Sequence, residues 1–197
     1  MKSEIEAKFL NVDHDEIRAK LTALGAECVQ PMRQMRRMTF ENPAMKARNG
    51  WIRVRDEGDR TTLSYKQTDA LTIDGTKETE VTVSSFDDMI AIMQQFDMNH
   101  GSFQESRRET WRLGDAEIVL DEWPWLHPYI EIEAETSELV QSTAEQLGFS
   151  MGDALYGDVM VAYRAQYPHL SETDTVGGLS EVKFDTPLPD MMKPPKT

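Results

Sequence analysis

The chain has little of several features that would otherwise define its class. It holds one cysteine, Cys28, among 197 residues, so no disulfide can form within the chain. No stretch approaches the roughly 18 consecutive apolar residues of a membrane-spanning helix. The first residues contain no apolar signal segment. These absences lead us to expect a cytoplasmic protein with no membrane partner.

Positive charge is also scarce. The chain has 21 Lys and Arg against 35 Asp and Glu, which gives a formal net charge of -14. Proteins that bind nucleic acids or anionic membranes need a positive surface, so we expect neither partner. Any phosphate that this chain binds must therefore meet a local basic site. The length fits one domain, or one domain with a tail.

Short segments that alternate between polar and apolar residues recur along the chain. In the opening segment, Glu4, Glu6 and Lys8 would share one face of a strand, while Ile5 and Ala7 would share the other. The same period of two returns in later segments, and it predicts strands there too. The eight expected strands cover residues 4–8, 33–40, 52–55, 62–66, 78–83, 107–113, 117–121 and 129–135.

Helical patterns separate these strands. Asp13 and Ser85 stand where N-terminal caps would, and Gly25 and Gly148 stand where helices would end. Apolar residues at helical spacing form a stripe that could cover one face of a sheet. The expected helices cover residues 13–24, 85–96, 137–147 and 154–166.

The C-terminal residues have a different composition. Beyond Pro168 the chain is rich in Ser, Thr, Gly and Pro, which is typical of a segment without a packed core. We therefore expect a main domain over residues 1–167 and an appended tail over residues 168–197. One short strand near residues 180–184 is compatible with the tail.

The polar faces of the expected strands carry charges of both signs. Clustered arginines are costly without an anion, and clustered carboxylates are costly without a cation. A polyphosphate with a bound divalent metal ion would neutralise the charges of both sets. Arg donates bidentate hydrogen bonds to phosphate oxygens, and hard carboxylate oxygens suit Mg²⁺ or Mn²⁺. The set comprises Glu4, Glu6, Lys8, Arg37, Arg53, Arg55, Lys66, Glu78, Glu80, Arg108, Arg112, Glu117, Asp121, Glu131, Glu133 and Glu135.

Two folds are compatible with this pattern. Alternation alone does not show closure, so the strands could form an open antiparallel sheet whose charged face is simply solvated. Because the other faces are apolar and helices are available to cover them, we expect instead an α+β fold. That fold is an eight-stranded antiparallel closed β-barrel, a tunnel with a charged interior and helices packed outside.

An ordered set of motifs resembles one known family. Glu4-x-Glu6-x-Lys8 is similar to the ExExK hallmark of the CYTH family, also called triphosphate tunnel metalloenzymes. That family includes class IV adenylyl cyclases, thiamine triphosphatases and inorganic triphosphatases. The resemblance continues in order over about residues 1–165. The further matching segments are Arg37 to Glu41, Ile52 to Arg55, Ser64 to Lys66, Glu78 to Glu80, Arg108 to Trp111, Leu120 to Asp121 and Glu131 to Glu133.

The resemblance implies a tunnel that binds a triphosphate-containing small molecule with Mg²⁺ or Mn²⁺. It assigns the phosphates to Lys8, Arg37, Arg53, Arg55, Lys66 and Arg108. It assigns the metal, directly or through water, to Glu4, Glu6, Asp121, Glu131 and Glu133. It gives a supporting role, or a second metal, to Glu78 and Glu80. It also implies a possible homodimer.

Three functions remain open at this point. The first is a metal-dependent triphosphatase in which water attacks the terminal phosphorus in line. The second is an adenylyl cyclase that converts ATP to cyclic AMP and diphosphate, although the His-Phe-x-x-Arg motif of that subgroup is absent. The third is a polyphosphate or nucleotide sensor without activity, against which the acidic residues argue.

The chain departs from the family pattern in places. Leu155 replaces the usual serine before Tyr156, and a basic residue often found upstream is missing, for which Lys183 or Arg164 could substitute. We interpret His127, which lies among prolines, as a structural or solvated residue rather than a proton shuttle. Three charges near strand ends are interpreted as solvated rim charges. They are Arg112, Glu117 and Glu135.

Overall fold

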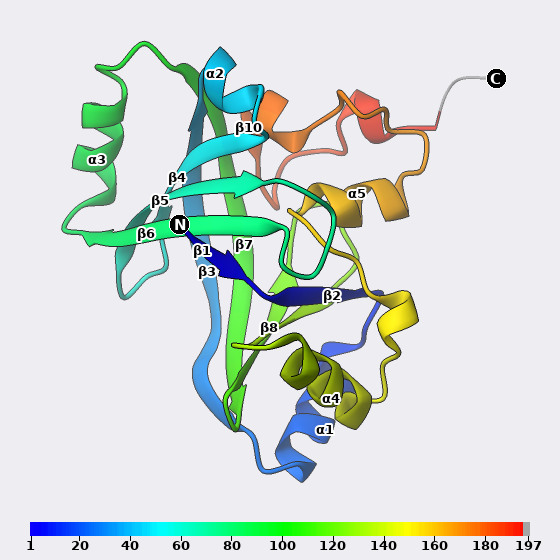
Figure 1. Ribbon diagram of the computed structural model, residues 1–197. Coiled ribbons are helices and arrows are strands. Elements are labelled where there is room, and N and C mark those ends of the chain that lie inside the picture. The colour runs from blue at the N-terminus through cyan, green and yellow to red at the C-terminus, as the bar shows by residue number, and fades with distance from the viewer. Residues whose placement is uncertain (195–197) are drawn as a thin grey trace.

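The computed structural model describes residues 1–194, apart from the side chain of His100, and within them ten strands form one sheet. The longest strands, β3 (Glu27–Glu41) and β7 (Asn99–Leu113), have 15 residues each and run the height of the molecule in Figure 1. The strands are β1 (Lys2–Glu4), β2 (Glu6–Leu10), β3 (Glu27–Glu41), β4 (Gly50–Asp56), β5 (Thr61–Thr68), β6 (Thr76–Val83), β7 (Asn99–Leu113), β8 (Ala116–Glu122), β9 (Tyr129–Glu133) and β10 (Glu181–Val182).

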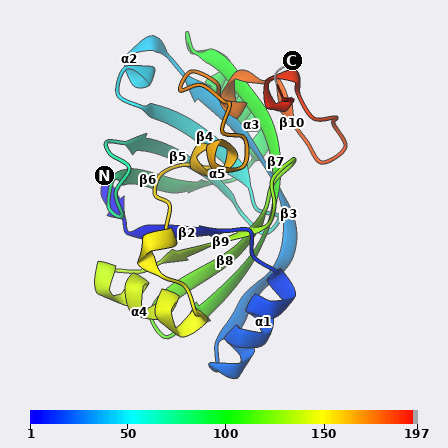
Figure 2. The same ribbon diagram turned by 90° about the vertical axis from the view of Figure 1, so that its right-hand side faces the viewer.

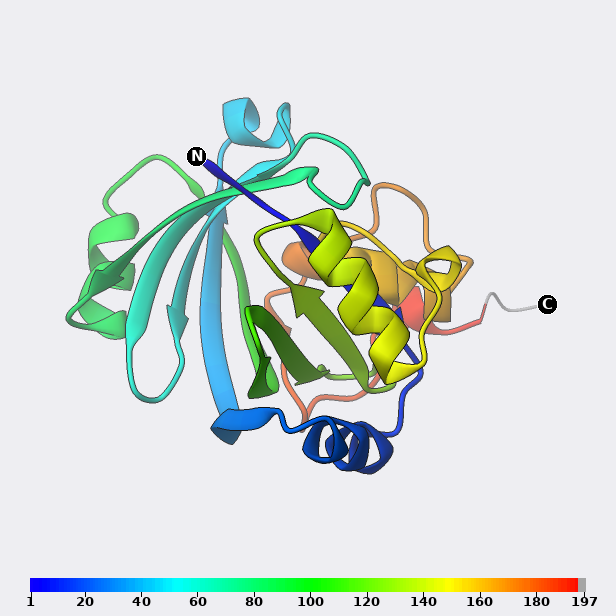
Figure 3. The same cartoon turned by 60° about the horizontal axis from the view of Figure 1, so that its bottom comes forward.

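The two N-terminal strands, β1 and β2, bring the edges of the sheet together. The strand order is β1-β6-β5-β4-β3-β7-β8-β9-β2, and every neighbour in it is antiparallel. β1 and β2 stand at opposite ends of this order, yet only Ile5 separates them in the chain. The N-terminal residues therefore bridge the two edges and leave one seam, as Figure 3 shows from below. The expected α+β barrel is confirmed, and the open sheet is wrong.

The barrel differs from the expectation in its strand count. The single expected strand over residues 4–8 is divided at Ile5, so nine strands rather than eight make the barrel wall. At the division the backbone changes partner: the Glu6 amide donates to the carbonyl of Ile73 at 3.0 Å, and the Ala134 amide donates to the carbonyl of Ile5 at 3.1 Å. The tenth strand, β10, pairs in parallel with β7 outside this path.

Local capping explains where the helices begin and end. The Asp13 carboxylate accepts the amides of Asp15 and Glu16 at the start of α1, and Gly148, with a φ of 87°, ends α4 in the left-handed conformation. The last expected helix begins at Met160 rather than near residue 154. The helices are α1 (His14–Ala23), α2 (Pro43–Lys46), α3 (Phe86–Met93), α4 (Ser137–Leu147) and α5 (Met160–Gln166), with 3-10 turns η1 (Met151–Asp153), η2 (Val176–Gly178) and η3 (Asp190–Met192).

The apolar faces of the strands point outward and are covered by helices. Ile118 and Ile130, both fully buried, contact the cluster that α1 and α4 complete, while Phe86 of α3 packs over Val54. Figure 2 shows α1 and α4 along the outside of β2, β8 and β9. Because the side chains alternate, the charged faces of the same strands point into the barrel.

The C-terminal segment packs against the barrel. Leu170, Val176, Val182 and Met192 are all buried in one cluster with Tyr163 of α5. The expectation that this end packs poorly is therefore wrong for these residues, and β10 is the short strand that was expected. The boundary at residue 167 stays a prediction, and residues 195–197 of the expected tail lie outside the described part. Within residues 1–194, no helix has the length and apolarity needed to cross a membrane.

Candidate functional site

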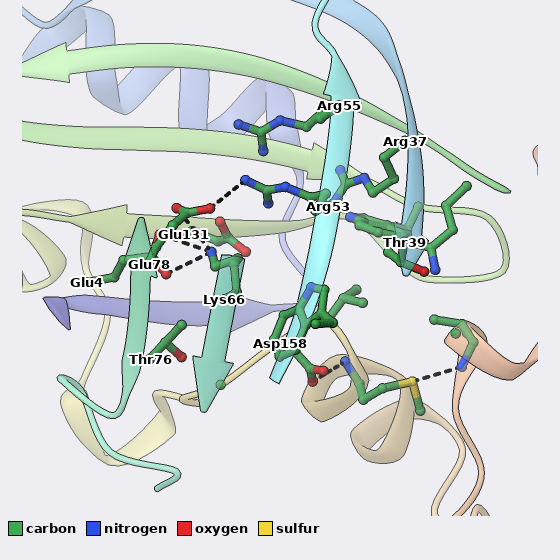
Figure 4. A pocket seen from close by; sticks show the side chains of 18 of the residues that line it. Glu4, Arg37, Thr39, Arg53, Arg55, Lys66, Thr76, Glu78, Glu131 and Asp158 are labelled. Atoms are coloured by element: carbon green, nitrogen blue, oxygen red, sulfur yellow. Dashed lines mark hydrogen bonds and ion pairs between the residues drawn. The ribbon is translucent and has the colours of Figure 1, made fainter. Parts of the chain in front are cut away.

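The barrel encloses a cavity of about 400 Å³, which is within the range of small-molecule sites. Twelve of the thirteen expected site residues line it, and Figure 4 shows several of them converging from different strands. Asp121 is the exception: it is 1% exposed and lies behind Arg108. The twelve are Glu4, Glu6, Lys8, Arg37, Arg53, Arg55, Lys66, Glu78, Glu80, Arg108, Glu131 and Glu133.

Strand register brings these charges together. On β4, Arg53 and Arg55 point inward because Val54 between them is fully buried in the outer core. Lys66 on β5 stands directly opposite Glu78 on β6. Opposite charges on adjacent strands thus meet across the inner face, where cross-strand pairs stabilise a sheet.

Arg37 is a buried cation without an ion-pair partner among the described residues. It is 8% exposed, its Nη2 donates to Ser106 Oγ at 2.7 Å, and its guanidinium lies 4.4 Å from the Trp123 ring centroid. In the described part of the chain it forms no ion pair with a carboxylate, and its Nε has no hydrogen-bond partner. Burial and the charges of Arg53 and Arg55 hold the pKa of Arg37 well below its usual value.

The neighbouring arginines also have unused hydrogen-bond donors. The Nε atoms of Arg53 and Arg55 are buried without hydrogen-bond partners. Arg53 donates from Nη2 to Glu78 at 2.9 Å and to Glu80 at 3.3 Å. Burial, followed by repulsion from Arg53, lowers the pKa of Arg55 to about 10. Buried donors of this kind normally have partners. Arg37, Arg53 and Arg55, which we call the arginine wall, are therefore suited to an anion rich in oxygen acceptors.

The second wall is acidic. Glu4 contacts Lys66, with 2.7 Å between Oε2 and Nζ. Burial, against the charge of Lys66 and with the help of Glu78, raises the pKa of Glu4 to about 8. Burial also opposes ionisation of Glu78, but the hydrogen bond with Glu4 and the charge of Arg53 lower its pKa to about 2. The pKa values of this hydrogen-bonded pair are therefore moved apart, that of Glu4 upward and that of Glu78 downward.

A third group of ion pairs holds the far side of the cavity in place. Lys8, which is 2% exposed, lies 2.7 Å from Glu6 and 3.1 Å from Glu131. Arg108 donates to Asp121 Oδ1 at 2.7 Å and to Glu131 Oε2 at 2.9 Å. Although burial opposes it, Glu131 and Glu6 raise the pKa of Lys8 above its usual value. This network fixes two cations before any ligand arrives.

The acidic residues fit a hard divalent cation that is shared with a ligand. Among the described residues, no three Asp, Glu, His or Cys side chains form a ready metal cluster. Mg²⁺ is commonly held by one or two carboxylates together with phosphate oxygens, so a full protein cage is not needed. Desolvation of the carboxyl inside the barrel and the negative charges of Glu6 and Glu117 raise the pKa of Glu133 to about 7. In the described part of the chain Glu133 forms no ion pair, so a cation beside it would meet an unneutralised carboxyl.

Several cavity residues were not expected. Glu117, interpreted as a rim charge, lines the cavity, and its position opposite Glu133 on β9 was a signal available from the alternation. The segment from Tyr156 to Met160 resembles a family motif, which was a signal for the lining residues between Gly157 and Met160. No sequence pattern pointed to the lining residues between Thr175 and Gly177.

The expected substitutes for the missing basic residue do not reach the cavity. Lys183 pairs with Glu181 at 2.9 Å, and Arg164 donates to the carbonyls of Glu172 and Asp174. Neither lines the cavity, so that expectation is wrong. His127 does not line it either, and its amide donates to Gln166.

The chain is thus an antiparallel barrel, closed except for one seam, whose interior carries arginines and carboxylates. The CYTH domain family model matches residues 2–155. The chain belongs to the CYTH family.

Solved structures share this fold. PH1012 from Pyrococcus horikoshii is 22% identical, with a TM-score of 0.66, covering 77% of this chain and 93% of that one. A provisionally named adenylate cyclase from Vibrio parahaemolyticus is 14% identical, with a TM-score of 0.70, covering 82% and 97%. HpAC1 from Hippeastrum, a provisionally named adenylyl cyclase described as having a dominant triphosphatase activity, is 15% identical, with a TM-score of 0.55, covering 83% and 96%. A search of curated proteins finds no match.

Proposed function

We propose that this chain is a divalent-metal-dependent triphosphatase that acts on inorganic triphosphate or on a triphosphate ester. The observation that carries the proposal is the buried guanidinium of Arg37, which forms no ion pair among the described residues, together with the buried Nε donors of Arg53 and Arg55 that have no hydrogen-bond partner. Across the cavity, Glu133 is a carboxyl that likewise forms no ion pair in the described part of the chain. A triphosphate with Mg²⁺ or Mn²⁺ supplies the missing charge of both signs.

The chain's own residues would bind and orient the substrate. Arg37, Arg53 and Arg55 have free donors for phosphate oxygens, and their fixed positions would align the phosphate chain for in-line attack. Lys8 and Arg108, held by Glu131, would neutralise charge that develops on the transferred phosphoryl group.

A carboxylate is needed to accept the proton of the attacking water. Glu133 lines the cavity opposite Glu6 and Glu117 and forms no ion pair among the described residues, so we assign it the role of general base. The metal, held by Glu4, Glu6 and Glu131 with the phosphates, would withdraw charge from the phosphorus and acidify bound water. Inorganic triphosphate would give diphosphate and phosphate, and an ester would give its diphosphate and phosphate.

A class IV adenylyl cyclase is the second candidate. Three proteins of the same fold carry an adenylyl cyclase name, and one of them is described as having a dominant triphosphatase activity. The absence of the His-Phe-x-x-Arg motif from this sequence favours hydrolysis.

One assay separates these functions. Phosphate release would be measured from inorganic triphosphate, thiamine triphosphate and ATP with Mg²⁺ or Mn²⁺, and cyclic AMP would be assayed in the same ATP samples. We expect phosphate release without cyclic AMP. Cyclic AMP with diphosphate would establish the cyclase instead, and binding without any turnover would indicate a sensor.

A further inference from the structure

One end of the cavity is built by a part of the chain that the family match does not include. That match ends at residue 155. Val159 and Met160 at the start of α5, and Thr175, Val176 and Gly177 around η2, all line the cavity. In Figure 4, Asp158 lies at this end, beyond Arg53 on the side away from Arg55.

This part of the wall is anchored rather than loose. The Val176 amide donates to the sulfur of Met160 at 3.3 Å, and the Val176 side chain is 2% exposed. Farther along, the Phe103 amide of β7 donates to the carbonyl of Ser180 at 3.0 Å, and Trp125 Nε1 donates to the carbonyl of Thr186 at 3.0 Å. The segment therefore presents a fixed surface to a ligand.

The chemistry of the cavity changes along its length. The arginines and Lys66 gather on the strands, whereas the lining residues 157–160 and 175–177 include one acidic residue, Asp158, and no basic residue. A phosphate chain gains charge-assisted hydrogen bonds among the arginines and none at residues 175–177. An uncharged heterocycle has the opposite preference, since burying it against apolar atoms is favourable.

We infer that residues 175–177 form the binding site for the organic group of a triphosphate ester, and that Gly177 sets the room available for it. This inference rests on the proposed triphosphate function and deepens it. The substrate class it names is an ester that bears an uncharged heterocycle, rather than inorganic triphosphate alone.

Two adjacent glycines provide a matched pair for the test. A Cβ on Gly177 would meet only Thr175 Oγ1, at 3.4 Å, and a Cβ on Gly178 would meet only Thr175 Cγ2, at 3.7 Å. Neither glycine has a φ in the left-handed region, so the fold accepts a side chain at both positions. Gly177 lines the cavity and Gly178 does not.

The experiment compares Gly177→Leu with Gly178→Leu. Calorimetry with Mg²⁺ would measure the Kd of β,γ-methylene-ATP and of methylene-bridged inorganic triphosphate, which are not hydrolysed. Overfilling a fitted site is costly, so we expect Gly177→Leu to raise the Kd of the ATP analogue by roughly tenfold. The inorganic analogue should change by less than about twofold, and Gly178→Leu should change neither Kd. Thermal melting would show that both variants fold.

Three results would overturn the inference. One is that Gly177→Leu weakens both analogues equally, and another is that it weakens neither. The third is that the wild-type chain binds the inorganic analogue but not the ATP analogue, which would leave the proposed triphosphate site in place. If the wild-type chain bound neither analogue, the proposed function would fail together with the inference.

Discussion

Replacing Arg37 by methionine should stabilise the protein without ligand and weaken triphosphate binding. Arg37 is 8% exposed, its guanidinium forms no ion pair among the described residues, and Arg53 and Arg55 are neighbours of like charge. Replacing buried charges by apolar groups of similar size can stabilise a protein by about 1–4 kcal/mol. A side chain that costs the ligand-free protein this much stability is expected to serve binding.

Two favourable contacts reduce the gain. The hydrogen bond to Ser106 contributes about 1 kcal/mol. The contact with Trp123 contributes about 1 kcal/mol, part of which methionine sulfur replaces. We expect a net gain of about 1 kcal/mol, or roughly 2–4 °C in Tm for a chain of this size. Binding should weaken by at least about 30-fold, since removing one partner of a buried charged contact costs about 2 kcal/mol or more.

Arg36 is the matched control, because it is adjacent in the chain and lies on the other face of β3. It pairs with Asp56 at 3.0 Å and its guanidinium lies 4.5 Å from the Phe86 ring centroid. Arg36→Met should not raise Tm and should leave binding unchanged. Melts by circular dichroism and calorimetry with inorganic triphosphate would provide both readouts. A clear loss of stability in Arg37→Met with unchanged binding would refute the reasoning.

Three further predictions concern the same cavity. Inorganic triphosphate at 100 times its Kd should add about 2.7 kcal/mol of stability even without metal, which a melt would show as a rise in Tm; no rise would contradict an anion site at the arginines. Glu4 and Glu133 have pKa values raised from 4.5 to about 8 and about 7, so the stability they contribute is fully present below pH 4.5 and is lost as pH rises from 4.5 to about 8. We expect the Tm of the ligand-free protein to fall between pH 4.5 and about 8, and this fall should be smaller in Glu4→Gln if the assignment holds. Glu131→Gln should raise the Mg²⁺ concentration needed for turnover, because it removes the charge of a carboxylate that we assign to the metal. The same carboxylate pairs with Lys8 and Arg108. An unchanged metal dependence would remove Glu131 from the metal site.

The charged interior could be predicted because alternation is a local property. Arg53 and Arg55 must share a face once Val54 is assigned to the core, and the same holds for Glu4, Glu6 and Lys8. The barrel closure was predictable only in outline. The division at Ile5 depends on which strands stand beside it, and those neighbours come from residues near positions 73 and 134.

Strand lengths were underestimated for a physical reason. The expected strand over 33–40 extends back to Glu27, although Pro31 interrupts it, because register shifts on either side of Gln30 absorb the proline.

The C-terminal wall could not be predicted either. Val176, Val182 and Met192 are buried, but their spacing follows neither a strand nor a helix period, and their partners are distant in the sequence. Ion-pair partners likewise required the register. No sequence pattern showed that Arg37 would lack a carboxylate while Arg108 would have two.

The most direct test of the central claim is the initial rate of phosphate release from inorganic triphosphate with Mg²⁺, measured for the wild-type chain and for Arg53→Ala. Arg53 lines the cavity and has an unused buried donor. We predict metal-dependent release by the wild-type chain, and a lower turnover with a higher substrate requirement in the folded variant. Equal rates in both proteins would contradict a triphosphate site inside the barrel.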